Sequence, residues 1–180
     1  MKQSTPPHME RTGEAHVTEL SAAMDRLREE HEMLAGLLEE MEEQAMKVGQ
    51  AESRAQAWGR LQHLRLWTIG VMQELDAHSG WEEETLFPFL ASYFRLRQEP
   101  TMIPSLWMME KEHAMAEEYV ETFMREFHKL RADSPKDEMK KAAALLIQAC
   151  YILKSHLAKE EQIVFPLAEQ VLTDVDYLFA

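Results

Sequence analysis

The sequence lacks the features that mark secreted and membrane-spanning proteins. It holds one cysteine, Cys150, in 180 residues, so no disulfide can form within the chain. Its first residues lack the apolar segment of a secretory signal peptide. The most apolar run, residues 142–153, is too short to span a bilayer and contains Gln148. These absences predict a cytoplasmic protein that does not enter a membrane.

Basic residues are also scarce relative to acidic ones. The chain has 19 lysines and arginines against 32 aspartates and glutamates, which gives a formal net charge of -13 at pH 7. The basic residues are scattered along the chain and form no patch. An acidic surface repels phosphate groups, so we expect no binding to nucleic acid or to an anionic membrane.

Glycine and strand-forming patterns are the third deficiency. Only six glycines occur, and no segment shows the alternation of Val, Ile or Thr with polar residues that is typical of strands. Ala, Leu, Glu, Gln, Lys and Arg fill most of the chain and favour helix. We predict an all-α fold in which a flexible N-terminal arm, residues 1–17, precedes one bundle domain, residues 18–180.

Four long amphipathic helices are predicted, because apolar residues recur at steps of three and four. Polar breaks at residues 49–53 and 133–135 connect the first helix to the second and the third to the fourth. Such short connections favour an up-down-up-down four-helix bundle. The first helix is predicted over residues 18–48, and the second should end or kink at Pro88, with a short bent helix after it. The third is predicted over residues 105–131, with Ser105 as its N-cap. The fourth should begin at Pro135 and be interrupted at Pro166.

Two stretches of the chain repeat one pattern. HSGWEEETLFP at 78–88 and HLAKEEQIVFP at 156–166 share a histidine, three residues, Glu-Glu, two residues, an aliphatic residue and Phe-Pro. In a helix, a residue and the one four positions later share a face. His78 with Glu82, and His156 with Glu160, should therefore each direct an imidazole and a carboxylate into the bundle.

Histidines on the other two helices complete a cluster. His31 and His113 lie on the apolar stripes of the first and third helices. Two residues of an antiparallel hairpin lie at one height when they are equally far from the turn. The midpoint between His113 and His156 falls in the second break, and the midpoint between His31 and His78 falls about one turn beyond the first. Four imidazoles and two carboxylates should meet at one level.

This combination of side chains predicts metal ions. Burying two ionised carboxylates is costly unless a cation lies between them. Mixed imidazole and carboxylate ligands suit iron, manganese or zinc. Each of two ions would receive two imidazoles, oxygens of the bridging Glu82 and Glu160, and a solvent-derived bridge. A sixth position would stay open for a small ligand such as dioxygen, hydrogen peroxide or nitric oxide.

Each residue taken singly has a plainer interpretation. A histidine on an apolar stripe is more often a hydrogen-bonded core residue, and a lone HxxxE pair is most often an exposed pair on a helix. The plain alternative is a helical interaction bundle that binds no metal, but the double repeat favours the metal site. We expect Glu83 and Glu161 to be solvated or to support the ligands. The histidines expected at the surface are His8, His16, His63 and His128.

These residues resemble the hemerythrin-like (HHE cation-binding) family. The matching elements are EEHEML with His31, HSGWEEETLFP with His78 and Glu82, KEHAMAEE with His113, and HLAKEEQIVFP with His156 and Glu160, over nearly all of residues 18–170. The resemblance implies a non-heme di-iron centre in a four-helix bundle, with the two glutamates as bridges and the four histidines as terminal ligands.

The chain departs from the oxygen-carrying members of that family at one position. Those members have a second histidine four positions after the third-helix ligand, where this chain has Glu117. The resemblance therefore implies no five-histidine carrier site, and Glu117 is a seventh ligand, an acceptor for a ligand's hydrogen bond, or a solvated residue.

The implied function is binding of, or reaction with, dioxygen, peroxide or nitric oxide, in sensing, detoxification or iron handling. One alternative is metal binding or iron storage without turnover. Another is iron-sulfur cluster repair, because the ligand set is similar to that of repair proteins of the same superfamily. Those proteins usually carry an N-terminal cysteine-bearing segment, and the first residues here contain no cysteine.

Overall fold

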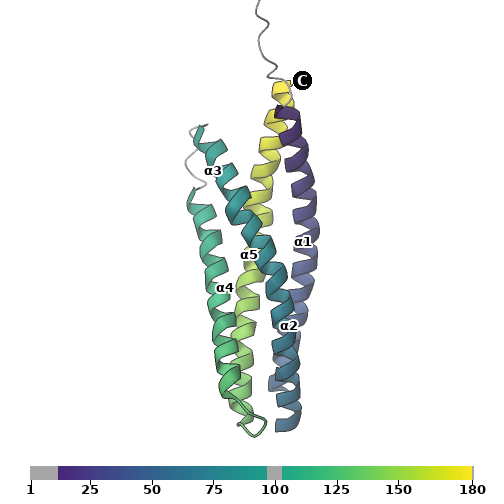
Figure 1. Ribbon diagram of the computed structural model, residues 1–180, viewed down its shortest axis with the longest axis vertical. Coiled ribbons are helices and arrows are strands. Elements are labelled where there is room, and N and C mark those ends of the chain that lie inside the picture. Colours follow the sequence, from purple (N-terminus) through teal and green to yellow (C-terminus); the bar gives the residue numbers. More distant parts are fainter. Residues whose placement is uncertain (1–11, 97–102, 180) are drawn as a thin grey trace, which may run out of the picture.

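The computed structural model describes residues 12–96 and 103–179, with side chains described for residues 20–96 and 105–174. Four long helical rods make up this part of the protein (Figure 1): α1 (Thr12–Gly49), α2 (Arg54–Trp81) continued by α3 (Phe87–Leu96), α4 (Ile103–Lys129) and α5 (Lys136–Phe179). Successive rods run in opposite directions, which confirms the predicted all-α up-down-up-down bundle. No helix in the described ranges is long and apolar enough to cross a membrane.

Local side-chain hydrogen bonds start α2. Ser53 is its N-cap, and the Ser53 hydroxyl accepts a hydrogen bond from the backbone N–H of Gln56. The Gln56 side chain in turn accepts from the backbone N–H of Glu52 at 2.7 Å. Reciprocal bonds of this kind satisfy N–H groups that a helix start leaves free, which explains why the first hairpin turns here.

The two hairpins are tied together where they turn. The guanidinium of Arg54, at the first turn, donates to the carbonyl oxygen of Asp133 at 3.2 Å. The ammonium of Lys136, at the second turn, donates to the carbonyl oxygen of Ala51 at 3.0 Å. These bonds fix the height of one hairpin against the other, and a cluster built from all four helices requires that alignment.

The apolar core is divided into two clusters of buried side chains. The larger one lies nearer the hairpin turns and includes Leu34, Leu64 and Phe123. The smaller one lies toward the other end and includes Leu27 and Leu86. Burying each such side chain contributes about 1.5–3 kcal/mol to the free energy of folding. Between the two clusters, every rod carries polar residues on its inner face.

Two helices begin earlier than predicted. α1 begins at Thr12, so the last residues of the predicted arm are helical, whereas residues 1–11 lie outside the described ranges. α4 begins at Ile103, which places Ser105 inside the helix and not at its N-cap. Pro104 fits in the first turn of α4, because the N–H that proline lacks would have no partner there. Most of the predicted break before Ser105 lies outside the described residues.

The chain adopts different local structures at its two Phe-Pro sequences. The rod formed by α2 does not stop at Pro88; it widens into a π-helical turn, Glu82–Leu86, and continues as α3. In the wide turn the N–H of Phe87 bonds the carbonyl of Glu82, five residues back. Pro88 then falls in the first turn of α3, where a missing N–H costs little.

The predicted interruption at Pro166 is wrong. α5 runs without a break from Lys136 to Phe179, with Pro166 inside it. An interior proline costs a helix about 3 kcal/mol. The neighbours Phe165 and Ala168 are buried in the smaller core cluster, and this packing on both sides of the proline offsets the lost hydrogen bond.

The single thiol provides a test of the core. Cys150 is fully buried, and burial raises the pKa of its thiol to about 12. Because the thiolate is the reactive form, the folded chain should resist iodoacetamide at about pH 8 and react once unfolded. Mass spectrometry of the alkylated chain across a guanidinium chloride series measures this. Rapid labelling of the native chain would contradict the burial of Cys150.

Candidate metal centre

The structure brings the six predicted ligand residues together between the two core clusters. They form two overlapping groups, in each of which one ligand atom per residue lies within 4.8 Å of the others. Both groups contain both glutamates, and each group adds one pair of histidines. The groups are His31, His78, Glu82 and Glu160, and Glu82, His113, His156 and Glu160.

Each carboxylate spans the two histidine pairs. One oxygen of Glu82 faces the pair from α1 and α2, and its other oxygen faces the pair from α4 and α5; Glu160 does the same. This is the placement expected of carboxylates that bridge two metal ions. The distances are 3.4 Å from Glu82 Oε1 to His78 Nε2, 3.8 Å from Glu82 Oε2 to His113 Nε2, 3.3 Å from Glu160 Oε2 to His31 Nε2, and 3.3 Å from Glu160 Oε1 to His156 Nε2.

Polar atoms of the cluster are buried and unpaired. Glu82 and Glu160 are fully buried, and within the described part of the chain none of their four oxygens has a hydrogen-bond partner. The Nε2 atoms of His31 and His78 also have none. Leaving such atoms unpaired costs about 1–3 kcal/mol each, and more for a charged group. Cations between the imidazoles and carboxylates would satisfy all of these atoms, so the donor set fits metal ions.

The two carboxylates have opposite pKa shifts. Burial, and next the charge of Glu160, raise the pKa of Glu82 well above its usual value. Burial acts on Glu160 as well, but the imidazoles of His156, His31 and His78 outweigh it and hold the pKa of Glu160 well below its usual value. Of the two carboxylates, Glu82 therefore holds a proton more readily, and a bound cation would favour its ionised form.

A glutamate from a neighbouring helix faces the Nδ1 atom of every cluster histidine. In the tautomer protonated at Nδ1, the Nδ1–H group donates a hydrogen bond to the carboxylate, and the lone pair of Nε2 faces the cluster, as a metal ligand requires. The Nδ1–oxygen distances are 3.3 Å for His31 and Glu161, 3.1 Å for His78 and Glu30, 2.7 Å for His113 and Glu83, and 3.3 Å for His156 and Glu112.

These four contacts form a closed ring around the bundle. A glutamate of α1 supports the histidine of α2, the π turn after α2 supports α4, α4 supports α5, and α5 supports α1. The Glu30–His78 and Glu112–His156 contacts lie within hairpins, and the other two contacts join one hairpin to the other. Each hairpin therefore has one contact of each kind, in the same order along the chain. The ring therefore repeats the internal duplication that the sequence shows.

Sequence reasoning found only half of the ring. Glu83 and Glu161 were expected to be solvated or to support the ligands, and the structure gives both a supporting contact. Glu30 and Glu112 were missed. A signal was present, because each of them directly precedes a cluster histidine, in Glu-His at 30–31 and again at 112–113.

Some residues considered as candidates lie away from the cluster. Glu117 is exposed and belongs to neither ligand group; it lines a small cavity that also reaches His113. His63 and His128 are exposed, as predicted. His8 and the side chain of His16 lie outside the described residues.

Comparison with known proteins gives one match. The model of the family described as "Hemerythrin HHE cation binding domain" matches residues 22–168, which contain all six cluster residues and the four supporting glutamates. No curated protein and no solved structure matches the chain.

The supporting role of Glu83 can be separated from general surface charge. Glu83 contacts His113, whereas Glu84 beside it is exposed. Glu83→Ala should weaken metal affinity by roughly tenfold, the low end for a lost supporting contact, because the Glu83 carboxylate is partly solvated. Glu84→Ala should leave affinity unchanged. Titration of ferrous iron against a competing chelator measures both variants, and equal losses would show that the contact with His113 has no role.

Proposed function

The chain belongs to the hemerythrin HHE cation-binding domain family, and we propose that its cluster holds two iron ions that bind or react with dioxygen, peroxide or nitric oxide. The observation that carries this proposal is the placement of Glu82 and Glu160, each with one oxygen toward each histidine pair. Iron, when bound, supplies reversible one-electron chemistry between its ferrous and ferric states.

The ligand set supports iron or manganese over zinc. Each half of the cluster offers two imidazole nitrogens and two carboxylate oxygens, with no thiolate. Structural zinc sites are mostly closed and tetrahedral, often with cysteine. Imidazole and carboxylate together suit metals that accept more ligands and keep positions open, as in di-iron and di-manganese carboxylate bundles. Family membership favours a cation, and the donor set favours iron or manganese.

A small cavity supports a ligand of a few atoms. It measures about 50 Å³ and reaches His78, His113 and His156 from the side of α2 and α4. That volume holds a water molecule or a diatomic gas and excludes a metabolite. Asp76 and Glu117 also line the cavity and give it a negative charge, which suits neutral ligands such as dioxygen, hydrogen peroxide and nitric oxide.

The chain's own residues perform three tasks in this proposal. The ring of supporting glutamates holds each Nε2 lone pair in place. Glu82 and Glu160 supply the negative charge that draws cations to the centre. Apolar side chains beside the cluster, such as Leu75, Leu153 and Leu157, limit the water that reaches it. We also propose that the protein acts in the cytoplasm, as the single cysteine and the sequence of the first residues indicate. Because the chain is acidic, we propose no binding to nucleic acid or membrane.

Metal content tests the proposal directly. Protein expressed with iron and purified without chelator should contain about two irons per chain, as in di-iron bundles, with near-ultraviolet absorption from an oxygen-bridged pair. Glu82→Ala removes one bridge and should lose most of this iron, whereas Glu118→Ala, an exposed position on α4, should retain it. Elemental analysis and an absorption spectrum of the same samples measure both. Folded, colourless wild-type protein that refuses added iron would establish the metal-free bundle instead.

Metal binding should also stabilise the fold. A ligand at a thousand times its Kd stabilises the native state by about 4 kcal/mol, which corresponds to a rise in Tm of roughly 10 °C for a chain of this length. Calorimetry with ferrous iron, under anaerobic conditions, should show this rise in the wild type and little of it in Glu82→Ala. Equal shifts in both proteins would indicate metal bound elsewhere on the acidic surface.

A further inference from the structure

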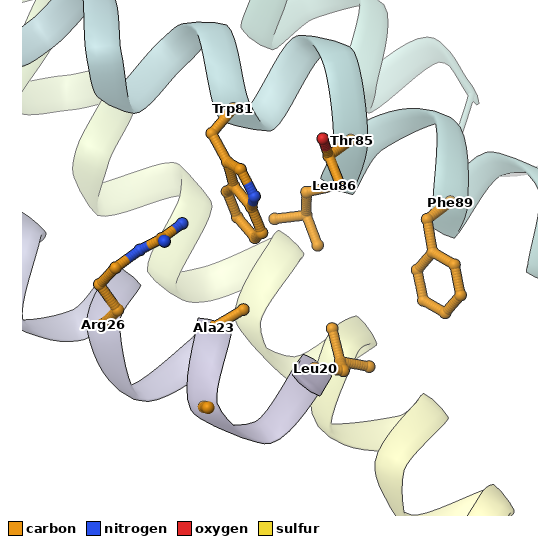
Figure 2. A pocket seen from close by; sticks show the side chains of 8 residues that line it. Leu20, Ala23, Arg26, Trp81, Thr85, Leu86 and Phe89 are labelled. Atoms are coloured by element: carbon orange, nitrogen blue, oxygen red, sulfur yellow. The ribbon is translucent and has the colours of Figure 1, made fainter. Parts of the chain in front are cut away.

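A second and larger cavity lies between α1 and the π turn that follows α2 (Figure 2). It measures about 640 Å³, within the range of small-molecule sites. Its walls are mostly apolar and come from Leu20, Ala23, Trp81, Leu86 and Phe89. Figure 2 shows these side chains facing a common space, with Leu20 and Phe89 at one end and Trp81 at the other.

The end near Trp81 is polar. The guanidinium of Arg26 lies 5.0 Å from the centre of the Trp81 ring, and its Nε atom lies 3.1 Å from Glu30. Among the described residues, the Nη atoms of Arg26 have no hydrogen-bond partner. The hydroxyl of Thr85 also lines the cavity, on the π turn. In the part of the chain that the structure describes, the cavity thus combines apolar walls with one cation whose Nη donors have no protein partner.

We propose that this cavity binds a small amphipathic carboxylate. The apolar body lies against Leu20, Ala23 and Phe89, and the carboxylate pairs with the Nη donors of Arg26. Among the lining residues whose side chains the structure describes, Arg26 is the only charged one, and a guanidinium pairs with a carboxylate through two parallel hydrogen bonds. Six positions separate Leu20 from Arg26, about 9 Å along the helix, which suits a chain or ring of modest length.

The residues at the polar end of the cavity do not recur at the equivalent positions of the second hairpin. Arg26 stands five positions before His31, where the second hairpin has Met108 before His113. Trp81 stands three positions after His78, where the second hairpin has Lys159 after His156. Lys159 there forms an ion pair with Glu112, the counterpart of Glu30. Arg26 and Trp81 are therefore a feature of the first hairpin alone.

One carboxylate joins this cavity to the metal centre. Glu30 Oε1 forms an ion pair with Arg26 Nε at 3.1 Å, and Glu30 Oε2 faces Nδ1 of His78 at 3.1 Å. A ligand carboxylate on the Nη atoms of Arg26 shares the charge of the guanidinium with Glu30 and so changes how firmly Glu30 holds the imidazole. Occupancy of the cavity therefore alters the surroundings of one metal ligand. This coupling rests on the proposed iron centre, whereas binding in the cavity does not.

Octanoate is a suitable probe of the cavity. Titration calorimetry on the purified full chain should show octanoate binding roughly tenfold or more tighter than 1-octanol, because the alcohol lacks the charge that Arg26 recognises. Arg26→Met keeps an apolar stem and should remove that difference. Arg125→Met, at an exposed position on α4, should preserve it. Octanoate that does not bind, or that binds no better than the alcohol, overturns the proposal.

Filling the cavity gives an independent test. Ala23→Leu places a larger side chain in the lining and should weaken octanoate binding by at least about tenfold, whereas Ala35→Leu, exposed on the same helix, should not. Circular dichroism checks that both variants fold. Undiminished binding in folded Ala23→Leu would place the ligand elsewhere and overturn the assignment.

The coupling has its own measurement. Octanoate should shift the near-ultraviolet absorption of the iron-loaded wild type and leave that of Arg26→Met unchanged. Binding without a spectral shift overturns the coupling and keeps the cavity assignment. If the chain takes up no iron, the proposed function fails. The calorimetric titration of the same folded protein still shows whether the cavity binds octanoate.

Discussion

Two carboxylates lie fully buried at the centre of a helical bundle, and the rest of the structure depends on compensating for them. Glu82 and Glu160 are fully buried and have no hydrogen-bond partners among the described residues. A buried carboxylate must be protonated or paired with a cation. The polar layer divides the apolar core in two, and the bonds between the hairpin turns hold the four helices at matching heights.

The helices and the six cluster residues could be predicted because their positions follow from local rules. Spacing of four residues sets His78 beside Glu82, and distance from a turn sets the height of His31. Contacts that depend on the rotation of one helix against another were harder to predict. Glu30 and Glu112 were missed for this reason.

The two prolines show the same limit in another form. Pro88 and Pro166 stand in equivalent sequences, yet one follows a π turn and the other lies inside an unbroken helix. Local sequence indicates that an N–H is missing and does not indicate how the chain accommodates the loss. Packing on neighbouring helices decides that, because burial of a few apolar side chains offsets the roughly 3 kcal/mol that an interior proline costs a helix.

The π turn also limits how far this protein can be treated as two equal halves. A chain built from two copies of the second hairpin would retain four histidines, two bridging glutamates and their supporting ring. It would lack the widened turn and, with it, Trp81, Thr85 and Phe89, which form one wall of the large cavity. Symmetrisation would thus preserve the inner coordination set while erasing the asymmetric pocket, so the two properties can be engineered separately.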